Sequence, residues 1–263
     1  MTRRIKRHQQ YELTLSIKDD AFIKTPRDAQ RNWFLNRVIR ESAEELQELN
    51  VIAPHMVRGS DQLIELDRQH GSLSETDIME DWQIPVMKAM ASAVTKQGGD
   101  VLEVGMGRGI ASDFIQEHDP KSHTIIECNE QIASTFDEWK SKYPGKDIKI
   151  VTSLWQECLD QLQMYDGILF HTYPLSDEEF VDTVVKDVTF AAHFLSVACE
   201  HLRPGGSLTY LTNEFDSLSR AHQRELFKYF SSFSLSVETN LDVPDNTRDA
   251  LWIKKMLIIK ATK

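Results

Sequence analysis

The sequence predicts an α/β fold with a mostly parallel, seven-stranded sheet and helices on both of its faces. From residue 100 onward, short apolar stretches alternate with amphipathic ones, which is the pattern of repeated strand–helix units. A glycine-rich turn, Gly105-Met-Gly-Arg-Gly109, follows the first apolar stretch. The last two apolar stretches follow one another without a helical pattern between them, so we expect an antiparallel hairpin at the C-terminal end.

Two helices are expected before the sheet begins. Thr25-Pro-Arg-Asp28 combines a capping residue, a proline at the first helical position and an acid in the first turn, which predicts a helix from Thr25 to Leu49. Helical spacing of apolar residues predicts a second helix over Asp77–Lys96, in which Pro85 bends or restarts the helix. Gly98-Gly99 ends it.

The remaining elements follow in alternation. The strands are expected at Val101–Val104, Thr124–Glu127, Ile148–Val151, Gly167–His171, Ser207–Thr212, Ser234–Thr239 and Leu251–Ala261. The helices are expected at Ile110–His118, Glu130–Lys142, near Glu157–Gln163, at Asp177–His201 and at Ser219–Phe230. Ligands of such folds bind beyond the carboxyl ends of the parallel strands, so we expect the site there.

Size and charge restrict the class of protein. The 263 residues are expected to form an N-terminal extension, residues 1–75, and one α/β domain, residues 76–263. With 30 Lys and Arg against 41 Asp and Glu, the net charge of -11 argues against a nucleic-acid partner. No apolar run approaches the roughly 18 residues that a membrane span needs, so no membrane partner is expected.

The N-terminus and the cysteines bear on where the protein is located. The basic start, residues 1–8, lacks the apolar region of a secretory signal. Three widely spaced cysteines form neither a CxxC pair nor a disulfide framework: Cys128, Cys158 and Cys199. We therefore expect a cytoplasmic protein.

The glycine turn indicates a cofactor that contains adenosine. About 20 residues after the turn, the second strand ends in Glu127, whose carboxylate can accept hydrogen bonds from both ribose hydroxyls. The glycines at 105, 107 and 109 do not give the dinucleotide spacing G-x-G-x-x-G, because position 110 is isoleucine. Glu103 in the motif suits a cationic methionyl group better than a pyrophosphate. These features favour S-adenosylmethionine (SAM) over a nicotinamide dinucleotide.

Several segments, in order and at compatible spacing over roughly residues 76 to 263, resemble the guanidinoacetate N-methyltransferase family. More distantly, they resemble the fungal protein-arginine delta-N-methyltransferases. The segments are Met79-Glu-Asp-Trp82, Val101-Leu-Glu-Val-Gly105, Ile126-Glu-Cys-Asn129, Asp166-Gly-Ile-Leu-Phe-His-Thr-Tyr-Pro-Leu-Ser176 and Arg203-Pro-Gly-Gly-Ser-Leu-Thr-Tyr210. The resemblance implies a Rossmann-like class I methyltransferase fold with SAM as cofactor and S-adenosylhomocysteine as product.

The resemblance also implies which residues hold the cofactor. Glu127 would hold the ribose, Cys128 and Asn129 would lie beside the adenosine, and Trp155 and Gln156 would flank the adenine. The methionyl part would be wrapped by the turn, with Glu103 nearby: Gly105, Gly107, Arg108, Gly109, Ile110, Ala111, Ser112 and Asp113. Met79 and Met87 match methionines that line the cofactor in the family, and His171 stands at a position that borders the transferring methyl group there.

The substrate side departs from the family. The family uses two carboxylates to hold a guanidine, and this chain has Gln83 and His171 in their places. A neutral imidazole suits a less basic nucleophile, so we expect a changed substrate, with His171 as base or hydrogen-bond partner. Other candidates for contact with the substrate are Glu80, Tyr173, Asn213 and Glu214, of which Tyr173 is also a catalytic candidate. For Glu80 and Glu214 a structural or surface role is the simpler interpretation.

We therefore expect a methyltransferase that acts on a small molecule, most simply on an amine, a ring nitrogen or a guanidino-type group in specialised or amino-acid metabolism. Three alternatives stay open: a guanidine such as free arginine held by relocated acids, oxygen methylation with His171 as base, and a SAM-binding pseudo-enzyme. No metal is expected, since the nine histidines lack metal-ligand spacing. The extension, residues 1–75, is expected to close over the site, to form a homodimer, or both.

Overall fold

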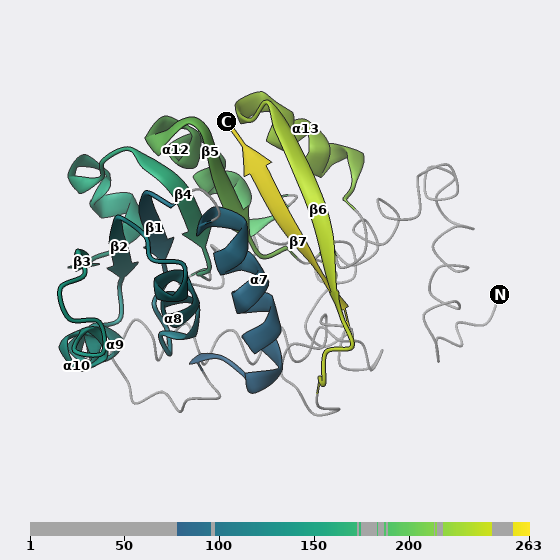
Figure 1. Cartoon of the computed structure of the whole chain (residues 1–263). Coiled ribbons are helices and arrows are strands. Elements are labelled where there is room, and N and C mark those ends of the chain that lie inside the picture. Colours follow the sequence, from purple (N-terminus) through teal and green to yellow (C-terminus); the bar gives the residue numbers. More distant parts are fainter. Residues whose placement is uncertain are drawn as a thin grey trace, which may run out of the picture.

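A computed structural model describes residues 78–95, 98–172, 189–212, 218–243 and 255–263, together with residues 174, 183, 187 and 214. Its centre is a seven-stranded sheet with the strand order β3-β2-β1-β4-β5-β7-β6 (Figure 1). The strands are β1 (Asp100–Val104), β2 (Ser122–Glu127), β3 (Ile148–Thr152), β4 (Tyr165–Phe170), β5 (Leu202–Tyr210), β6 (Ser232–Thr239) and β7 (Lys255–Thr262). Strands β1 to β5 run parallel, and β7 is antiparallel to both of its neighbours. The predicted fold class is confirmed.

Helices cover both faces of this sheet. Helices α7 (Ile84–Thr95) and α8 (Ile110–Glu117) pack on one face, and α12 (Leu195–His201) and α13 (Arg220–Tyr229) on the other (Figure 1). The first face buries Val101 and Leu169 beneath α7, and the second buries Leu102 and Ile168 beneath α12. Neighbouring residues of one strand thus enter opposite cores, as the two-residue period of a strand requires.

Several helices differ from the expectation in where they begin and end. The helix expected over Asp77–Lys96 is interrupted by a 3-10 turn, Asp81–Gln83, after which α7 starts at Ile84. Pro85 lies in the first turn of α7, where its missing N–H breaks no helical hydrogen bond, so it restarts the helix. Residues 77, 96 and 97 lie outside the described residues.

The helix expected over Glu130–Lys142 forms as two short helices, α9 (Glu130–Ser134) and α10 (Phe136–Lys140). At the break, the Ser134 and Thr135 hydroxyls donate to the carbonyls of Gln131 and Ile132. Such bonds compete with the helical ladder and explain the interruption.

Two further helices are corrected in part. The helix expected near Glu157–Gln163 forms as two 3-10 turns, Trp155–Glu157 and Leu159–Gln161. The C-terminal part of the helix expected over Asp177–His201 begins with a 3-10 turn, Phe190–Phe194, before α12. The expected helix Thr25–Leu49 and the extension, residues 1–75, lie outside the described residues.

Strand β5 begins five residues earlier than expected and includes Pro204, Gly205 and Gly206. The reason lies at the amino ends of the strands, where the Arg203 guanidinium donates to Asp166 at 2.6 Å and to Asp100 at 2.8 Å. These contacts fasten β5 to β4 and β1 before its apolar residues start. The opposite, carboxyl ends of the strands are left for the functional site.

In the described part of the chain, strand β6 lies at one edge of the sheet. Leu235 and Val237 are 43% and 41% exposed, although they lie opposite the buried Ile259 and Leu257 of β7. Residues directly opposite one another in a sheet point to the same face, so these two side chains extend the apolar face beyond the part covered by α13. Phe227 of α13 is 58% exposed.

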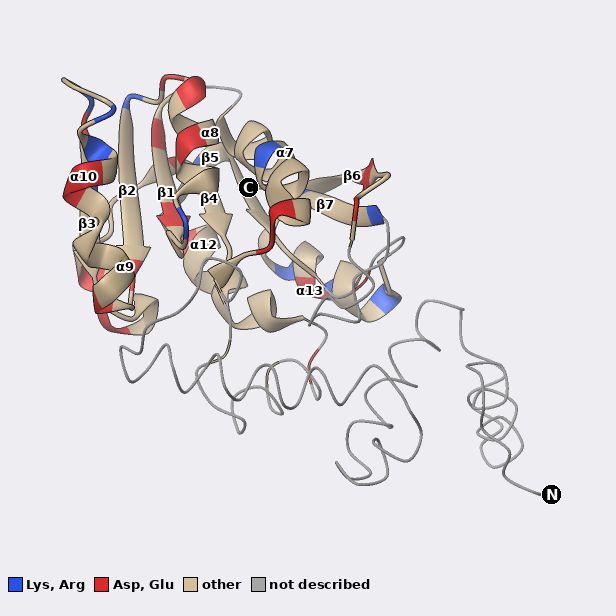
Figure 2. Ribbon diagram, turned by 90° about the horizontal axis from the view of Figure 1, so that it is seen from below, with Lys and Arg blue, Asp and Glu red and all other residues tan. Residues whose placement is uncertain are grey.

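No helix in the described ranges is long and apolar enough to cross a membrane. Figure 2 shows acidic residues on α8 and α10, beside the part of the sheet formed by β1, β2 and β3.

Candidate active site

The register of the parallel strands brings the predicted site together. Val104 at the end of β1 pairs with Ile126 of β2 and with Phe170 of β4, so Gly105, Glu127 and His171 follow at the same edge of the sheet. Strand β1 is also the point from which the strand order proceeds in opposite directions, β2 on one side and β4 on the other. Ligands of open α/β sheets bind at such a point.

The glycine turn connects the two sides of this edge. Gly105 has φ 93°, and a Cβ atom there would lie 2.1 Å from the carbonyl oxygen of His171. Only glycine therefore allows the turn to pack against the backbone of His171. Gly107 and Gly109 also have positive φ, at 51° and 74°, so the turn leads into α8 through three positions that side chains rarely adopt.

Glu127 is fixed by main-chain amides. One carboxylate oxygen accepts hydrogen bonds from the amides of Met106 at 2.8 Å and Gly107 at 3.2 Å, and the other accepts from Asn129 at 2.9 Å. The Asn129 side chain caps α9 by accepting from the amides of Gln131 and Ile132. The acid that is predicted to hold the ribose is thus oriented by the glycine turn itself, and it is almost fully buried.

A pocket opens beside this carboxylate. Five of the predicted cofactor residues line it: Gly105, Glu127, Cys128, Trp155 and Gln156. The remaining lining residues were not predicted from the sequence: Val104, Ile126, Ser153, Leu154, Thr172 and Phe190. Phe190 belongs to an aromatic cluster behind the pocket, in which Trp155 meets Phe194 edge-on at 5.1 Å. No sequence motif marks Phe190, whereas Thr172 could have been found from its place beside His171.

These residues fit SAM chemically. A carboxylate beside the pocket suits a ribose diol, the Trp155 ring offers an apolar face for a purine, and Gly105 lets the backbone come close. A phosphate cradle is not needed for such a ligand. In the described ranges no group of three metal-binding side chains occurs.

Other predicted cofactor residues make contacts of their own. The Asp113 carboxylate accepts from the Trp139 indole at 2.6 Å and from the Tyr143 hydroxyl at 2.7 Å, and burial together with Asp113 raises the pKa of Tyr143. The Ser112 hydroxyl donates to Glu103 at 2.6 Å. These side chains hold α8 to the neighbouring elements and do not line the pocket.

Glu103 is fully buried in β1, and His123 Nε2 of β2 lies 3.0 Å from one of its carboxylate oxygens. Its predicted contact with the methionyl group stays a prediction. Met79, Met87 and Ala111 are buried in the core around α7, with Ile110 packed against them. Arg108 donates to the Met79 carbonyl at 2.9 Å and to Asp81 at 2.7 Å, and so ties the glycine turn to the segment before α7.

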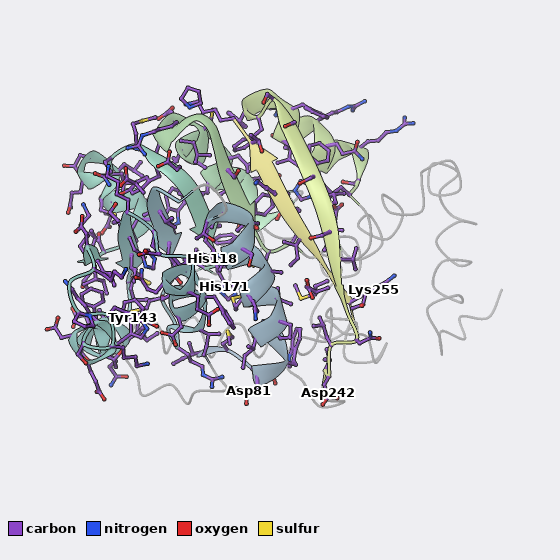
Figure 3. The ribbon with its side chains drawn as sticks, viewed as in Figure 1. Asp81, His118, Tyr143, His171, Asp242 and Lys255 are labelled. Carbon is purple, nitrogen blue, oxygen red and sulfur yellow. The ribbon has the colours of Figure 1, made fainter. Side chains whose placement is uncertain are left out.

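On the substrate side, His171 follows β4 and its amide donates to the Val104 carbonyl at 2.9 Å. Figure 3 shows it toward the middle of the molecule, while Asp81 lies at the lower edge. Burial lowers the pKa of His171 to about 4, so the imidazole is neutral at pH 7. It therefore has no charge with which to attract a cation or an anion.

Of the other substrate candidates, three have hydrogen-bond partners in the structure and two lie outside the described residues. Glu80 accepts from the Trp82 indole at 2.6 Å, Gln83 accepts from the amide of Glu80 at 3.1 Å, and the buried Glu214 lies 2.8 Å from a nitrogen of His222. Tyr173 and Asn213 lie outside the described residues.

The chain matches the family model of guanidinoacetate N-methyltransferase over residues 62–240. Fold, site and family model together define a SAM-dependent methyltransferase, with SAM as its cofactor. The chain belongs to the guanidinoacetate N-methyltransferase family. The predicted resemblance and cofactor are confirmed.

Among curated relatives, the chain is 32% identical over 116 residues to protein arginine N-methyltransferase 2 of Candida glabrata, covering 40% of this chain and 27% of that protein. It is 32% identical over 113 residues to the protein of the same name from Aspergillus oryzae, with coverage of 40% and 27%. The chain thus spans about a quarter of the length of the curated relatives that it matches.

Solved structures share the fold at low sequence identity. A spermidine synthase in complex with the transition state analogue AdoDATO superposes with a TM-score of 0.50 at 14% identity, covering 70% of this chain and 61% of that one. SMU.776, assigned as a methyltransferase and complexed with S-adenosylhomocysteine, gives 0.50 at 11% identity, with coverage of 73% and 51%.

Proposed function

We propose that the chain transfers the methyl group of SAM to a neutral nitrogen of a small molecule, an amine or a ring nitrogen. The observation that carries this proposal is the place and charge of His171. It follows β4 directly, its carbonyl oxygen packs against Gly105 of the cofactor turn, and its imidazole is neutral. A nucleophile that reaches the cofactor from the β4 side has to pass this imidazole.

Bound SAM supplies an electrophilic methyl group and leaves as S-adenosylhomocysteine, so a carbon–nitrogen bond forms as the carbon–sulfur bond breaks. Orientation is the main contribution that the protein can make to such a displacement. The neutral His171 ring accepts a hydrogen bond from an N–H of the nucleophile and thereby aims its lone pair. With a pKa of about 4, the ring holds a proton only briefly and passes the proton of the methylated nitrogen to water.

The same low pKa favours nitrogen over oxygen. An amine or ring nitrogen attacks with a lone pair that it already has, whereas a hydroxyl has to lose its proton as it attacks and gains from a stronger base. On the order of one His171 side chain in a thousand is protonated at pH 7 when its pKa is about 4. Such a group is a hydrogen-bond acceptor in the first place and a base only in the second.

Paired acids on the substrate side support a neutral nucleophile over a guanidinium. Of the described candidates, the Glu80 carboxylate accepts from Trp82, and the Asp81 carboxylate pairs with Arg108. Glu214 pairs with His222. A guanidinium that entered here would compete with these partners, whereas a neutral amine would need no carboxylate.

A substrate screen tests the proposal. The full chain is incubated with SAM and with separate panels of amines, ring-nitrogen compounds, guanidines and alcohols, and S-adenosylhomocysteine and methylated products are measured by mass spectrometry. We expect products from amines or ring nitrogens, and much less of them from the Glu127→Ala variant at the same SAM concentration. Turnover of guanidines alone would establish relocated acids, turnover of alcohols alone would establish oxygen methylation, and tight cofactor binding without any product would establish a pseudo-enzyme. Each of these three outcomes contradicts the proposal.

A further inference from the structure

Three buried side chains form a hydrogen-bonded chain at the carboxyl end of β5. The Tyr210 hydroxyl lies 2.7 Å from His222 Nε2, and His222 Nδ1 lies 2.8 Å from a carboxylate oxygen of Glu214. Tyr210 and His222 are fully buried and Glu214 is 3% exposed. No sequence motif indicates this network.

The hydrogen-bond directions follow from the groups themselves. Burial and, after it, the Glu214 carboxylate hold the pKa of Tyr210 well above its usual range, so its hydroxyl keeps its proton and can donate to His222 Nε2. The Nδ1 nitrogen of His222 then carries the other proton and donates to Glu214. Glu214 also accepts from the Ser219 amide at 3.1 Å, at the start of α13, where the helix dipole favours a negative charge.

The network joins three parts of the backbone: the end of β5 through Tyr210, the following segment through Glu214, and α13 through His222. Tyr210 pairs with Phe170 of β4, so the residues after Tyr210 lie beside His171. Leu211 and Thr212 are therefore the neighbours of His171 on the β5 side. Burying polar groups in this way adds little stability compared with an apolar core, but it fixes one geometry.

We propose that His222 is a positioning residue, which holds Leu211 and Thr212 at the end of β5 beside His171 so that the methyl acceptor finds a formed pocket. The expected effect of His222 on turnover rests on the proposed function. The expected effect of the network on the backbone after β5 does not. Glu214, expected from the sequence to contact the substrate, acts through this network. The cofactor side, around Glu127, shares no residue with it.

Two variants of His222 test the role in turnover, with the amine or ring-nitrogen acceptor that the screen identifies. In His222→Asn the side-chain amide can still donate to Glu214 in place of Nδ1, whereas His222→Ala removes the donor. We expect His222→Ala to raise KM for the acceptor about tenfold, with the Kd of S-adenosylhomocysteine unchanged within about twofold, and His222→Asn to recover most of the loss. Equal effects on KM and on cofactor Kd, or an asparagine variant no better than alanine, would overturn the proposal.

A measurement without turnover separates this inference from the proposed function. Tyr210→Phe keeps the buried ring and removes only the hydroxyl, and Tyr229→Phe on α13 is the matched control. We expect amide hydrogen exchange in the segment after β5, read at Leu211, Thr212, Glu214 and Ser219, to accelerate about tenfold in Tyr210→Phe, with exchange in α8 unchanged. Unchanged exchange in the segment would refute the positioning role even if methyl transfer is found, and accelerated exchange would support it even if no acceptor is found.

Discussion

The two halves of the site are held by different kinds of contact. On the cofactor side, Glu127 is oriented by the main-chain amides of Met106, Gly107 and Asn129, which are present whatever the side chains are. On the substrate side, the described residues after β5 are joined mainly through side chains, Tyr210 with His222 and Glu214. We therefore expect the orientation of Glu127 to be insensitive to the side chains of Met106 and Asn129, and the arrangement after β5 to depend on the side chains of Tyr210, His222 and Glu214.

The largest effect is expected where the two halves touch. Gly105→Ala places a Cβ atom 2.1 Å from the His171 carbonyl oxygen at a backbone φ of 93°, so either the turn or the end of β4 must move. We expect the free energy of unfolding to fall by more than about 3 kcal/mol, measured by urea denaturation. Gly145→Ala is the control, because Gly145 has a similar φ of 79° in open space and should lose only about 1 kcal/mol. Equal losses in the two variants would show that the halves are not packed together here.

The next effect isolates the cofactor half. Glu127→Ala removes the acceptor of three main-chain amides and the predicted ribose ligand. We expect the Kd of S-adenosylhomocysteine, measured by calorimetry, to rise about 100-fold, the equivalent of one or two hydrogen bonds to a charged group. Glu130→Ala changes an exposed acid three residues further on and should leave the Kd unchanged. A normal Kd for Glu127→Ala would contradict the ribose assignment.

The third effect isolates the substrate half. His171→Ala should lower kcat about 100-fold in the methyl-transfer assay, because the variant loses the group that orients the nucleophile. The Kd of S-adenosylhomocysteine should stay within about twofold. His118→Ala, at an exposed histidine of the α8 end, is the matched control. Loss of kcat and of cofactor affinity to the same extent would remove the assigned role.

The smallest effect is on stability against acid. The pKa of His171 is about 4 in the folded chain, below the usual 6.5, so the unfolded chain binds the proton first. The contribution of this residue is complete above pH 6.5 and is lost as the pH falls to 4. In urea denaturation at pH 7 and pH 4.5, His171→Asn should lose less stability on acidification than the unchanged chain. An identical loss in both would show that His171 is not desolvated.

The central strands of the sheet could be predicted from the sequence because β1, β2 and β4 are buried on both faces along nearly their whole length and contain short apolar runs. The start of β5 could not, because Pro204-Gly-Gly206 has the composition of a turn and is drawn into the sheet by contacts of Arg203 with Asp100 and Asp166. The break between α9 and α10 depends on hydrogen bonds from the hydroxyl groups of Ser134 and Thr135 to main-chain carbonyls. The spacing of apolar residues does not predict such bonds.

In the site, the glycine turn and Glu127 could be predicted from the sequence. Each directly follows one of two neighbouring parallel strands, so their spacing along the chain determines that they lie side by side. The partners of Glu103 and Asp113 could not be predicted, because His123, Trp139 and Tyr143 reach them from other elements. The role of His222 could not be read either, since a histidine within a polar helix has no distinguishing pattern. The expected dimer, the role of residues 1–75 and the parts of Tyr173 and Asn213 stay predictions.

Strand β6 has one further consequence. In the described part of the chain its outer backbone groups pair with no strand, and Leu235 and Val237 lie bare beside them. An exposed edge strand of this kind can pair with any peptide that offers complementary backbone hydrogen bonds and an apolar face. We therefore expect aggregation at high protein concentration to begin at this edge. The substitution Leu235→Lys would place a positive charge on this edge strand, so that two copies of the chain repel one another there. It would leave the catalytic edge, at the carboxyl ends of β1 and β4, unchanged.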